Sequence, residues 1–299
     1  MSAHSRYIVG IDLGTTHTVA AYLDTGQFDP DEAPPVPTLF AVAQVVQPGQ
    51  VEARPLLPSF LYLATPNDFP RSALDLPWAG GQGRDYVVGE LARQHGSLVP
   101  MRLVSSAKSW LCYDGVDRTA PILPYAAPAD GPDAVPKISP VDASARYISH
   151  IRDAWDAQFA AQGAPLAEQE VLLTVPASFD AVARDLTVRA AHAAGLARIT
   201  LLEEPQAAFY AWLGRHSRDW RKALQVGDTV LVCDIGGGTT DFSLISIGQQ
   251  DGNLQLERIA VGDHILLGGD NMDLALAMGL SKRLERDGHK LETWQRRAL

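Results

Sequence analysis

The chain has 299 residues, of which 46% are hydrophobic and 20% charged, and its formal net charge is −10. This length allows more than one hydrophobic core, and an acidic balance without a cluster of lysine and arginine argues against a nucleic-acid partner. Two cysteines, Cys112 and Cys233, are too few for a disulfide framework or a zinc site; Cys233 lies in an apolar run, where we expect a small buried side chain.

The N-terminal residues contain no basic segment followed by an apolar stretch, so no secretory signal is predicted. No apolar run reaches the roughly 18 residues that a membrane helix requires. We therefore expect a cytoplasmic protein that has no membrane partner.

Strand-like segments separated by long loops dominate the first half of the chain. Residues 7–12 form an apolar run that ends at Asp12, and a Gly-Thr-Thr turn leads into a second strand-like stretch. Further strands are predicted at 39–46 and 59–64. The intervening segments are rich in proline, glycine or acidic residues and are predicted to be loops, at 28–37, 65–85 and 121–136.

Helices and strands alternate from residue 139 onward, which indicates an α/β fold with an insertion in its first half. Ile148, Ile151, Trp155 and Phe159 recur at spacings of three and four, so they share one face of a helix predicted over 139–163. Strands are predicted at 170–176, 199–204 and 254–263, with two more inside 230–247, and a last helix at 271–287.

Capping residues delimit two shorter helices. Asp180 is a plausible N-cap and Gly195 a plausible C-cap for a helix over 180–195. Pro205 suits the first position of a helix over 205–214.

Two stretches far apart in the chain share one plan. "IVGIDLGTTHTVAAYLD" and "VLVCDIGGGTTDFSLIS" each consist of an apolar strand, an aspartate, a glycine-rich turn, Thr-Thr and a second strand. One such turn could be an ordinary hairpin, but two copies point to a common ligand. The glycines allow backbone N–H groups to approach phosphate oxygens, and an aspartate at a strand end suits a hydrated Mg²⁺. The P-loop pattern does not occur.

The two stretches resemble the phosphate motifs of the actin-like ATPase superfamily, and others narrow the resemblance to heat-shock protein 70 (DnaK-type) chaperones. "LLPSFLYL" resembles the family's "TPS" strand, "VVGELARQ" its "VGxxAK" segment and "SSAKSWL" the segment with its cleft lysine. "LLTVPASFDAVARDLTVRAAHAAGL", "LLEEPQAAFYAWL" and "GDHILLGGDNMD" resemble three further family stretches, although "LEEP" replaces "NEP". The resemblance runs in order from residue 7 to residue 299.

The resemblance implies a two-lobed actin-like (ribonuclease H-like) ATPase fold whose second lobe is truncated. A first lobe over 1–222 would contain a core subdomain at about 1–40 and 138–222, with an outer subdomain inserted at about 41–137. An incomplete second lobe over 223–299 would contain a core at about 223–267 and the start of its outer subdomain at 268–299.

The resemblance also implies roles for individual residues. Asp12 and Asp234 would orient waters on Mg²⁺, Lys108 would contact the phosphates and the attacking water, Glu204 would lie beside the metal, and Thr239 would place a hydroxyl near the γ-phosphate. The phosphate-binding residues would be Gly14, Thr15, Thr16, Gly236, Gly237, Gly238, Thr239, Gly268 and Gly269. Pro176 and Arg184 match the pair that relays nucleotide state in the family. Asp241 is expected to be structural, and His17 is assigned no chemistry.

These features predict an ATP-binding and ATP-hydrolysing nucleotide domain of a chaperone, with ATP or ADP and Mg²⁺ as cofactors; such chemistry consists mostly of positioning and charge neutralisation. The resemblance implies unfolded peptides, a J-domain co-chaperone and a nucleotide exchange factor as partners of the full-length parent. Two alternatives stay open: a nucleotide-sensing or scaffold module with little turnover, and a sugar-kinase-like transferase, for which no sugar pocket is found.

The chain ends at Leu299 in a helix-like run without a cap. In the family the second lobe continues, so the chain is expected to be a fragment that lacks the adenine half-site, the interdomain linker and the peptide-binding domain. Such a fragment should expose apolar surface and tend to self-associate.

Overall fold

A computed structural model of the chain describes residues 5–28, 35–70, 72–78, 84–128, 130, 134–216, 219–250, 253–289 and 291. No helix in these ranges is both long and apolar enough to cross a membrane.

A six-stranded sheet forms the centre of the first part of the chain. Its strands follow the order β11-β10-β1-β2-β3, and β6 also pairs with β2. β1 is antiparallel to β2 and parallel to β10, which is in turn parallel to β11. The strands are β1 (Tyr7–Leu13), β2 (His17–Asp24), β3 (Thr38–Phe40), β6 (Leu57–Pro58), β10 (Glu170–Val175) and β11 (Ile199–Glu203). The predicted pair of strands around the first Gly-Thr-Thr turn is confirmed.

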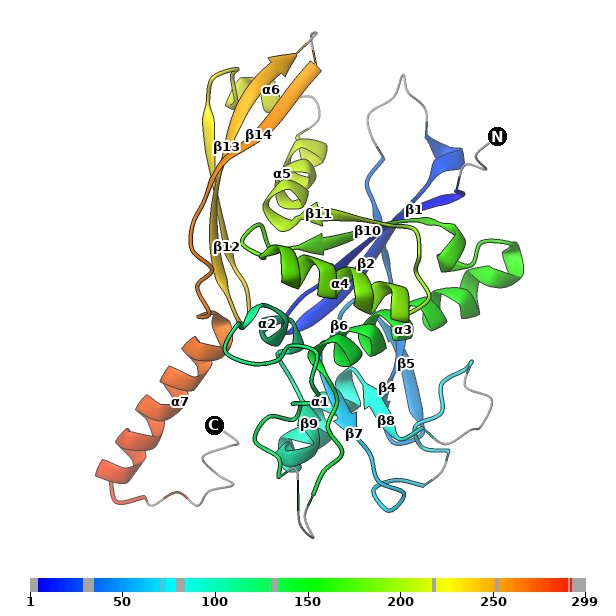
Figure 1. Ribbon diagram of the computed structural model, residues 1–299, viewed down its shortest axis with the longest axis vertical. Coiled ribbons are helices and arrows are strands. Elements are labelled where there is room, and N and C mark those ends of the chain that lie inside the picture. The colour runs from blue at the N-terminus through cyan, green and yellow to red at the C-terminus, as the bar shows by residue number, and fades with distance from the viewer. Residues whose placement is uncertain are drawn as a thin grey trace.

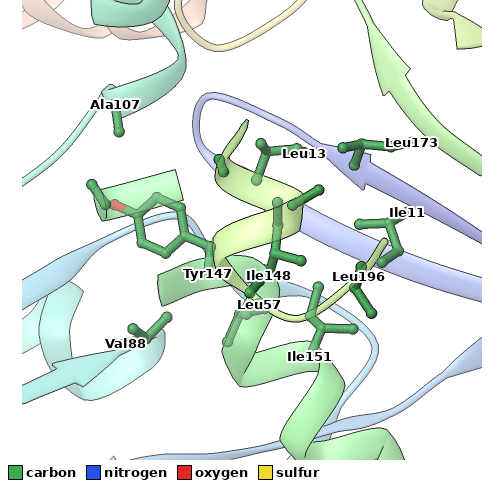
Figure 2. Close-up of a cluster of buried hydrophobic side chains, with 14 of the residues drawn as sticks. Ile11, Leu13, Leu57, Val88, Ala107, Tyr147, Ile148, Ile151, Leu173 and Leu196 are labelled. Atoms are coloured by element: carbon green, nitrogen blue, oxygen red, sulfur yellow. The ribbon is translucent and has the colours of Figure 1, made fainter. Parts of the chain in front are cut away.

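Helices α3 (Pro140–Phe159) and α4 (Ala181–Ala193) lie side by side against this sheet (Figure 1). Ser139 begins α3 with a capping box, in which its hydroxyl accepts from the Asp142 N–H and the Asp142 carboxylate accepts in return. The four apolar residues predicted to share one face of α3 are all buried. Figure 2 shows Ile148 and Ile151 of α3 packed against Ile11 of β1 and Leu173 of β10.

The elements between β3 and α3 that do not join the central sheet form a smaller region at one end of it (Figure 1). It contains a hairpin of β4 (Val42–Gln47) and β5 (Gln50–Arg54), and a sheet with the order β8-β7-β9. The remaining elements are β7 (Leu61–Leu63), β8 (Tyr86–Val88), β9 (Leu103–Val104), α1 (Glu90–Leu98) and α2 (Ala107–Cys112). A separate small core of this region includes Val45, Tyr62 and Leu91.

A three-stranded antiparallel sheet, with the order β12-β13-β14, forms the second part of the chain. Its elements are β12 (Thr229–Ile235), β13 (Thr240–Gln250) and β14 (Asn253–Val261), preceded by α5 (Glu204–Arg215) and α6 (Trp220–Ala223) and followed by α7 (Gly269–Arg286). Figure 1 shows α5 between the two sheets, and Phe209 of α5 packs on Ile245 and Ile247 of β13. Short 3-10 turns lie at Thr25–Gln27, Pro100–Arg102, Ala160–Gln162 and Leu166–Glu168.

The structure corrects several local predictions. The strand predicted over 39–46 is divided between β3 and β4, and the one predicted over 59–64 is shortened to β7. Ala194 caps α4, and Gly195 follows it in the left-handed conformation. Pro205 is the second residue of α5, because Glu204 begins that helix.

Cys233 is exposed, so its predicted burial is wrong. Side chains alternate along β12: Val230 and Val232 face α5 and β13, whereas Leu231, Cys233 and Ile235 face the other side. An apolar run does not reveal which face of its strand will be covered.

Apolar surface is exposed over the second part of the chain, as predicted. Leu231, Ile235 and Ile259 of the small sheet are more than half exposed. Helix α7 extends away from the rest of the structure (Figure 1), and its Leu274 and Leu276 are also more than half exposed. Self-association and the predicted subdomain boundaries stay predictions.

Candidate functional site

Two hairpin tips form the centre of the site. Asp12 and Asp234 are each the second-to-last residue of a seven-residue strand, β1 and β12, and a glycine-containing tip follows each strand. The tips lie close together: a Cβ atom added to Gly237 would lie 2.1 Å from Thr16 Cγ2, and one added to Gly238 would lie 2.6 Å from Thr15 Cγ2. A side chain at either position would have to displace a threonine side chain of the first tip, so glycine suits both positions.

A cavity of about 380 Å³ opens beside the tips. Of the site residues predicted from the sequence, it is lined by Asp12, Gly14, Thr15, Thr16, Lys108, Glu204, Asp234, Gly236, Gly237 and Thr239. His17, Thr174, Ala207 and Ala208 complete the lining. Five separate stretches of the chain, at 12–17, 108, 174, 204–208 and 234–239, therefore meet in one cavity.

Lys108 and Glu204 form a nearly buried ion pair inside the cavity. Lys108 Nζ lies 2.5 Å from Glu204 Oε1, and the two side chains are only 11% and 14% exposed. Lys108 is the second residue of α2, and Glu204 is the first residue of α5. Burial opposes the charge of Lys108, but the carboxylates of Glu204, Asp12 and Asp234 outweigh burial and raise its pKa, so the lysine stays charged.

Negative charge is in excess around this lysine. Burial raises the pKa of Glu204 and also the pKa of Asp234, because Lys108 compensates only part of the cost of charging each carboxylate. Among the described residues, no group of three acidic, histidine or cysteine side chains is placed to bind a metal directly. The carboxylates thus suit a cation that keeps its own waters, as Mg²⁺ does.

Two residues without a predicted role hold the first hairpin in place. Thr174 donates a hydrogen bond of 2.7 Å from Oγ1 to Asp12 Oδ1, since β10 lies parallel to β1 with Ile11 beside Leu173. Ser59 donates from Oγ to the Gly14 carbonyl at 2.7 Å and from its N–H to the Thr16 carbonyl at 2.9 Å. Both residues lie in stretches that resemble the family, which was the only signal for them in the sequence.

Gly268 and Gly269 lie behind the second hairpin tip and do not line the cavity. The Gly269 N–H donates to the Gly236 carbonyl at 2.9 Å. A Cβ atom added to Gly268 would lie 2.6 Å from the carbonyl oxygens of Gly236 and Gly237. These glycines support the loop from behind, and Gly238 faces a neighbouring cavity.

Arg184 lies outside the cavity and binds Glu203, the residue before Glu204. Arg184 Nη2 lies 2.9 Å from Glu203 Oε1, and Arg258 Nη1 of β14 lies 3.1 Å from the same oxygen. Both guanidinium groups also donate to the carbonyl of Ala177, which follows Pro176. Arg184, one member of the predicted relay pair, is therefore joined to β14 in the second part of the chain through Glu203, and the relay role of the pair stays a prediction.

Asp241 takes part in a second contact between the two parts of the chain, in keeping with its expected structural role. Ser178 Oγ donates to Asp241 Oδ1 at 2.5 Å, and His264 Nδ1 lies 2.9 Å from the same oxygen. The hydrogen bond to Asp241 raises the pKa of His264 to about 10, and hydrogen bonds from His264 and Ser178 outweigh burial and lower the pKa of Asp241.

This contact predicts a pH dependence of stability. Because the folded-state pKa of His264 is above its ordinary 6.5, its contribution is complete below about pH 6.5 and is lost as the pH rises toward 10. Asp241, with a lowered pKa, contributes above about pH 4 and loses its contribution as the pH falls. Urea unfolding should show that the stability difference between the native chain and His264→Gln shrinks from pH 6 to pH 9. A constant difference would contradict the pairing.

Comparison with known proteins identifies similar sequences over nearly the whole chain. A family model described as "Hsp70 protein" matches residues 82–298. The chain is 31% identical over 276 residues to a protein named "Chaperone protein HscA homolog" of Pseudomonas fluorescens, covering 91% of this chain and 37% of the relative. It is 30% identical over 302 residues to "Chaperone protein HscA" of Pectobacterium carotovorum, covering 96% and 40%. The chain thus spans about two fifths of the length of the curated relatives it matches.

Proposed function

The chain belongs to the Hsp70 family, whose nucleotide domain has the actin-like ATPase fold, and on that premise we propose that it binds ATP and ADP with Mg²⁺ between its two hairpin tips and hydrolyses ATP as part of a chaperone. The observation that carries the proposal is the Lys108–Glu204 pair in a cavity lined by both glycine tips and by Asp12 and Asp234. The positive charge of Lys108, the backbone N–H groups of the two tips and the carboxylates come together there from distant parts of the sequence.

Each group of residues in the cavity has a different chemical role in the proposed function. The backbone N–H groups of the two glycine tips suit the phosphate oxygens, and the Lys108 ammonium neutralises charge on the transferred phosphoryl group. Asp12 and Asp234 would hold a hydrated Mg²⁺, which supplies further positive charge when it is bound. Glu204 keeps the Lys108 ammonium in place.

Calorimetric titration with ATP tests the proposal directly. ATP should bind more tightly in the presence of Mg²⁺ than when a chelator has removed the metal. Inorganic tripolyphosphate should compete with ATP, because the site binds phosphates. Absence of ATP binding under both conditions would overturn the proposal. Binding without any turnover in the full-length protein would instead support the nucleotide-sensing alternative.

The relatives are named as chaperones, and we extend this to the full-length protein as a proposal. It would take unfolded peptides as clients and work in the cytoplasm with a J-domain co-chaperone and an exchange factor. Stimulation of its ATP turnover by an unfolded peptide would be the expected result.

The hydrogen bond from Thr174 to Asp12 gives a prediction about metal dependence. Thr174→Val keeps the side-chain shape but removes the hydroxyl, so Asp12 loses the donor that fixes its carboxylate. We expect the Mg²⁺ concentration needed for half-maximal ATP binding to rise roughly threefold to tenfold, which corresponds to one hydrogen bond. Thr174→Ser, which keeps the hydroxyl, serves as the control and should behave like the native chain. Equal metal dependence of both variants would contradict the role of Thr174.

A further inference from the structure

A second cavity lies on the other side of the second hairpin tip. Its volume is about 560 Å³, which is within the range of small-molecule sites. α2 and the segment 123–126 form one wall, and the start of α7 forms the opposite wall; Figure 1 shows α2 beside the start of α7. Gly238 and Ser109 line this second cavity, whereas their neighbours Gly237 and Lys108 line the first.

Three aromatic rings form the wall on the α2 side. Trp110 and Tyr125 stack with their centroids 4.7 Å apart and their planes at 25°, and Tyr113 contacts Trp110 edge-on at 5.8 Å. Tyr125 is 59% exposed and Tyr113 is 42% exposed, so both rings remain available to a ligand. Aromatic faces attract cations, and tryptophan does so most strongly.

The opposite wall carries Asp270, a solvent-exposed residue whose carboxylate forms no ion pair with another described residue. Asp270 is the one formally charged residue among the described residues that line the cavity, which include no lysine, arginine or histidine. Within the described part of the chain, no side chain forms an ion pair or a hydrogen bond with the Asp270 carboxylate. Partial burial raises the pKa of Asp270, the charge of Asp273 raises it further, and attraction to His17 does not offset these two effects.

The chemistry of the lining selects one class of ligand. Without a cationic side chain, the cavity does not suit the phosphates of a nucleotide. A bare divalent metal would need several oxygen ligands at short distance, whereas here a single carboxylate faces aromatic rings. The hydroxyls of Ser105, Ser106 and Ser109 add acceptors for N–H donors. We propose that this cavity binds a small organic cation of the guanidinium or ammonium class, with the charge at Asp270 and the body of the ligand against Trp110 and Tyr125.

Calorimetric titration of the chain with benzylguanidine tests the proposal, with benzylurea as a neutral ligand of nearly the same shape. Benzylguanidine should bind roughly tenfold more tightly than benzylurea, because only the guanidinium is charged. Equal affinities, or no binding of benzylguanidine, would overturn the proposal.

Three variants locate the binding site, and one of them is a matched control. Asp270→Asn should weaken benzylguanidine binding roughly fivefold to tenfold, and Trp110→Leu should do the same through loss of the ring. Asp273→Asn removes the same charge from the same end of α7 but from a residue that does not line the cavity, so it should leave the affinity unchanged. If Asp270→Asn and Asp273→Asn had the same effect, general electrostatic attraction would explain the binding and the proposed site would be wrong. Circular dichroism of each variant confirms that the fold is retained.

Discussion

Replacing Lys108 with alanine should lower the rate of ATP hydrolysis by the full-length protein at least about a hundredfold, while ATP binding decreases far less. The ammonium of Lys108 is the only lysine or arginine charge among the described residues that line the cavity. Charge that develops on the phosphoryl group during transfer would then lack this partner. Single-turnover hydrolysis, measured beside calorimetric ATP binding, separates the two effects. A hydrolysis rate unchanged by Lys108→Ala would contradict the proposed mechanism.

Stability must be separated from chemistry in this experiment, because Lys108 also compensates a nearly buried carboxylate. Breaking such a pair costs about 3–5 kcal/mol in typical cases. Lys108→Met should therefore lower the free energy of unfolding by up to about this amount. The double variant Lys108→Met/Glu204→Gln removes the unpaired charge and should recover most of the stability. Hydrolysis should remain lost in the double variant. Recovery of both properties together would mean that Lys108 acts only on the fold.

Replacing Gly14 with alanine should abolish ATP binding and destabilise the chain by about 3 kcal/mol or more, which is large for one substitution. A Cβ atom at Gly14 would lie 2.2 Å from the carbonyl oxygen of His17. This oxygen belongs to the backbone of the same hairpin, so the contact can be relieved only by opening the tip between β1 and β2. The tip would then no longer present its N–H groups to a phosphate.

Gly10→Ala provides the matched control, four residues earlier in the same hairpin. There a Cβ atom would meet only the Ala21 carbonyl oxygen at 4.0 Å. Alanine also restricts the unfolded chain more than glycine does, so the change should alter the free energy of unfolding by less than about 1 kcal/mol. Urea unfolding and ATP titration of both variants check the pair of predictions. Normal ATP binding by Gly14→Ala would show that the tip is more adaptable than its geometry indicates.

The repeated hairpin plan made much of this site predictable. Asp12 and Asp234 occupy equivalent strand positions, and the glycines between two strand-like runs identify the tips from the residue order alone. The meeting of Lys108 with Glu204 could not be obtained from spacing, because 96 residues separate them. Family resemblance predicted that they belong to one cleft, and the structure places them within hydrogen-bond distance.

The remaining features depend on tertiary packing that local patterns do not encode. Thr174 reaches Asp12 because β10 lies parallel to β1 in one particular register, and a one-residue shift would turn its hydroxyl to the other face of the sheet. The burial of Cys233 was mispredicted for a related reason, since both faces of β12 are apolar and only one is covered. The family resemblance predicted that Gly268 lies near the site. Its position behind the second hairpin tip depends on close approach to the backbone of Gly236 and Gly237, which the residue pattern does not encode.

Arg184 and Arg258 share one oxygen of Glu203, and this restricts the order in which these three residues can be exchanged during evolution. Arg184 and Arg258 both bind Oε1, while the buried Oε2 has no hydrogen-bond partner among the described residues. If either arginine is lost, the Glu203 carboxylate still pairs with the other guanidinium. We therefore expect the fold to tolerate a sequence that has lost one of the two arginines. If Glu203 is lost first, two like charges are left together beside the Ala177 carbonyl. We expect descendants of this sequence to exchange an arginine before they exchange the glutamate.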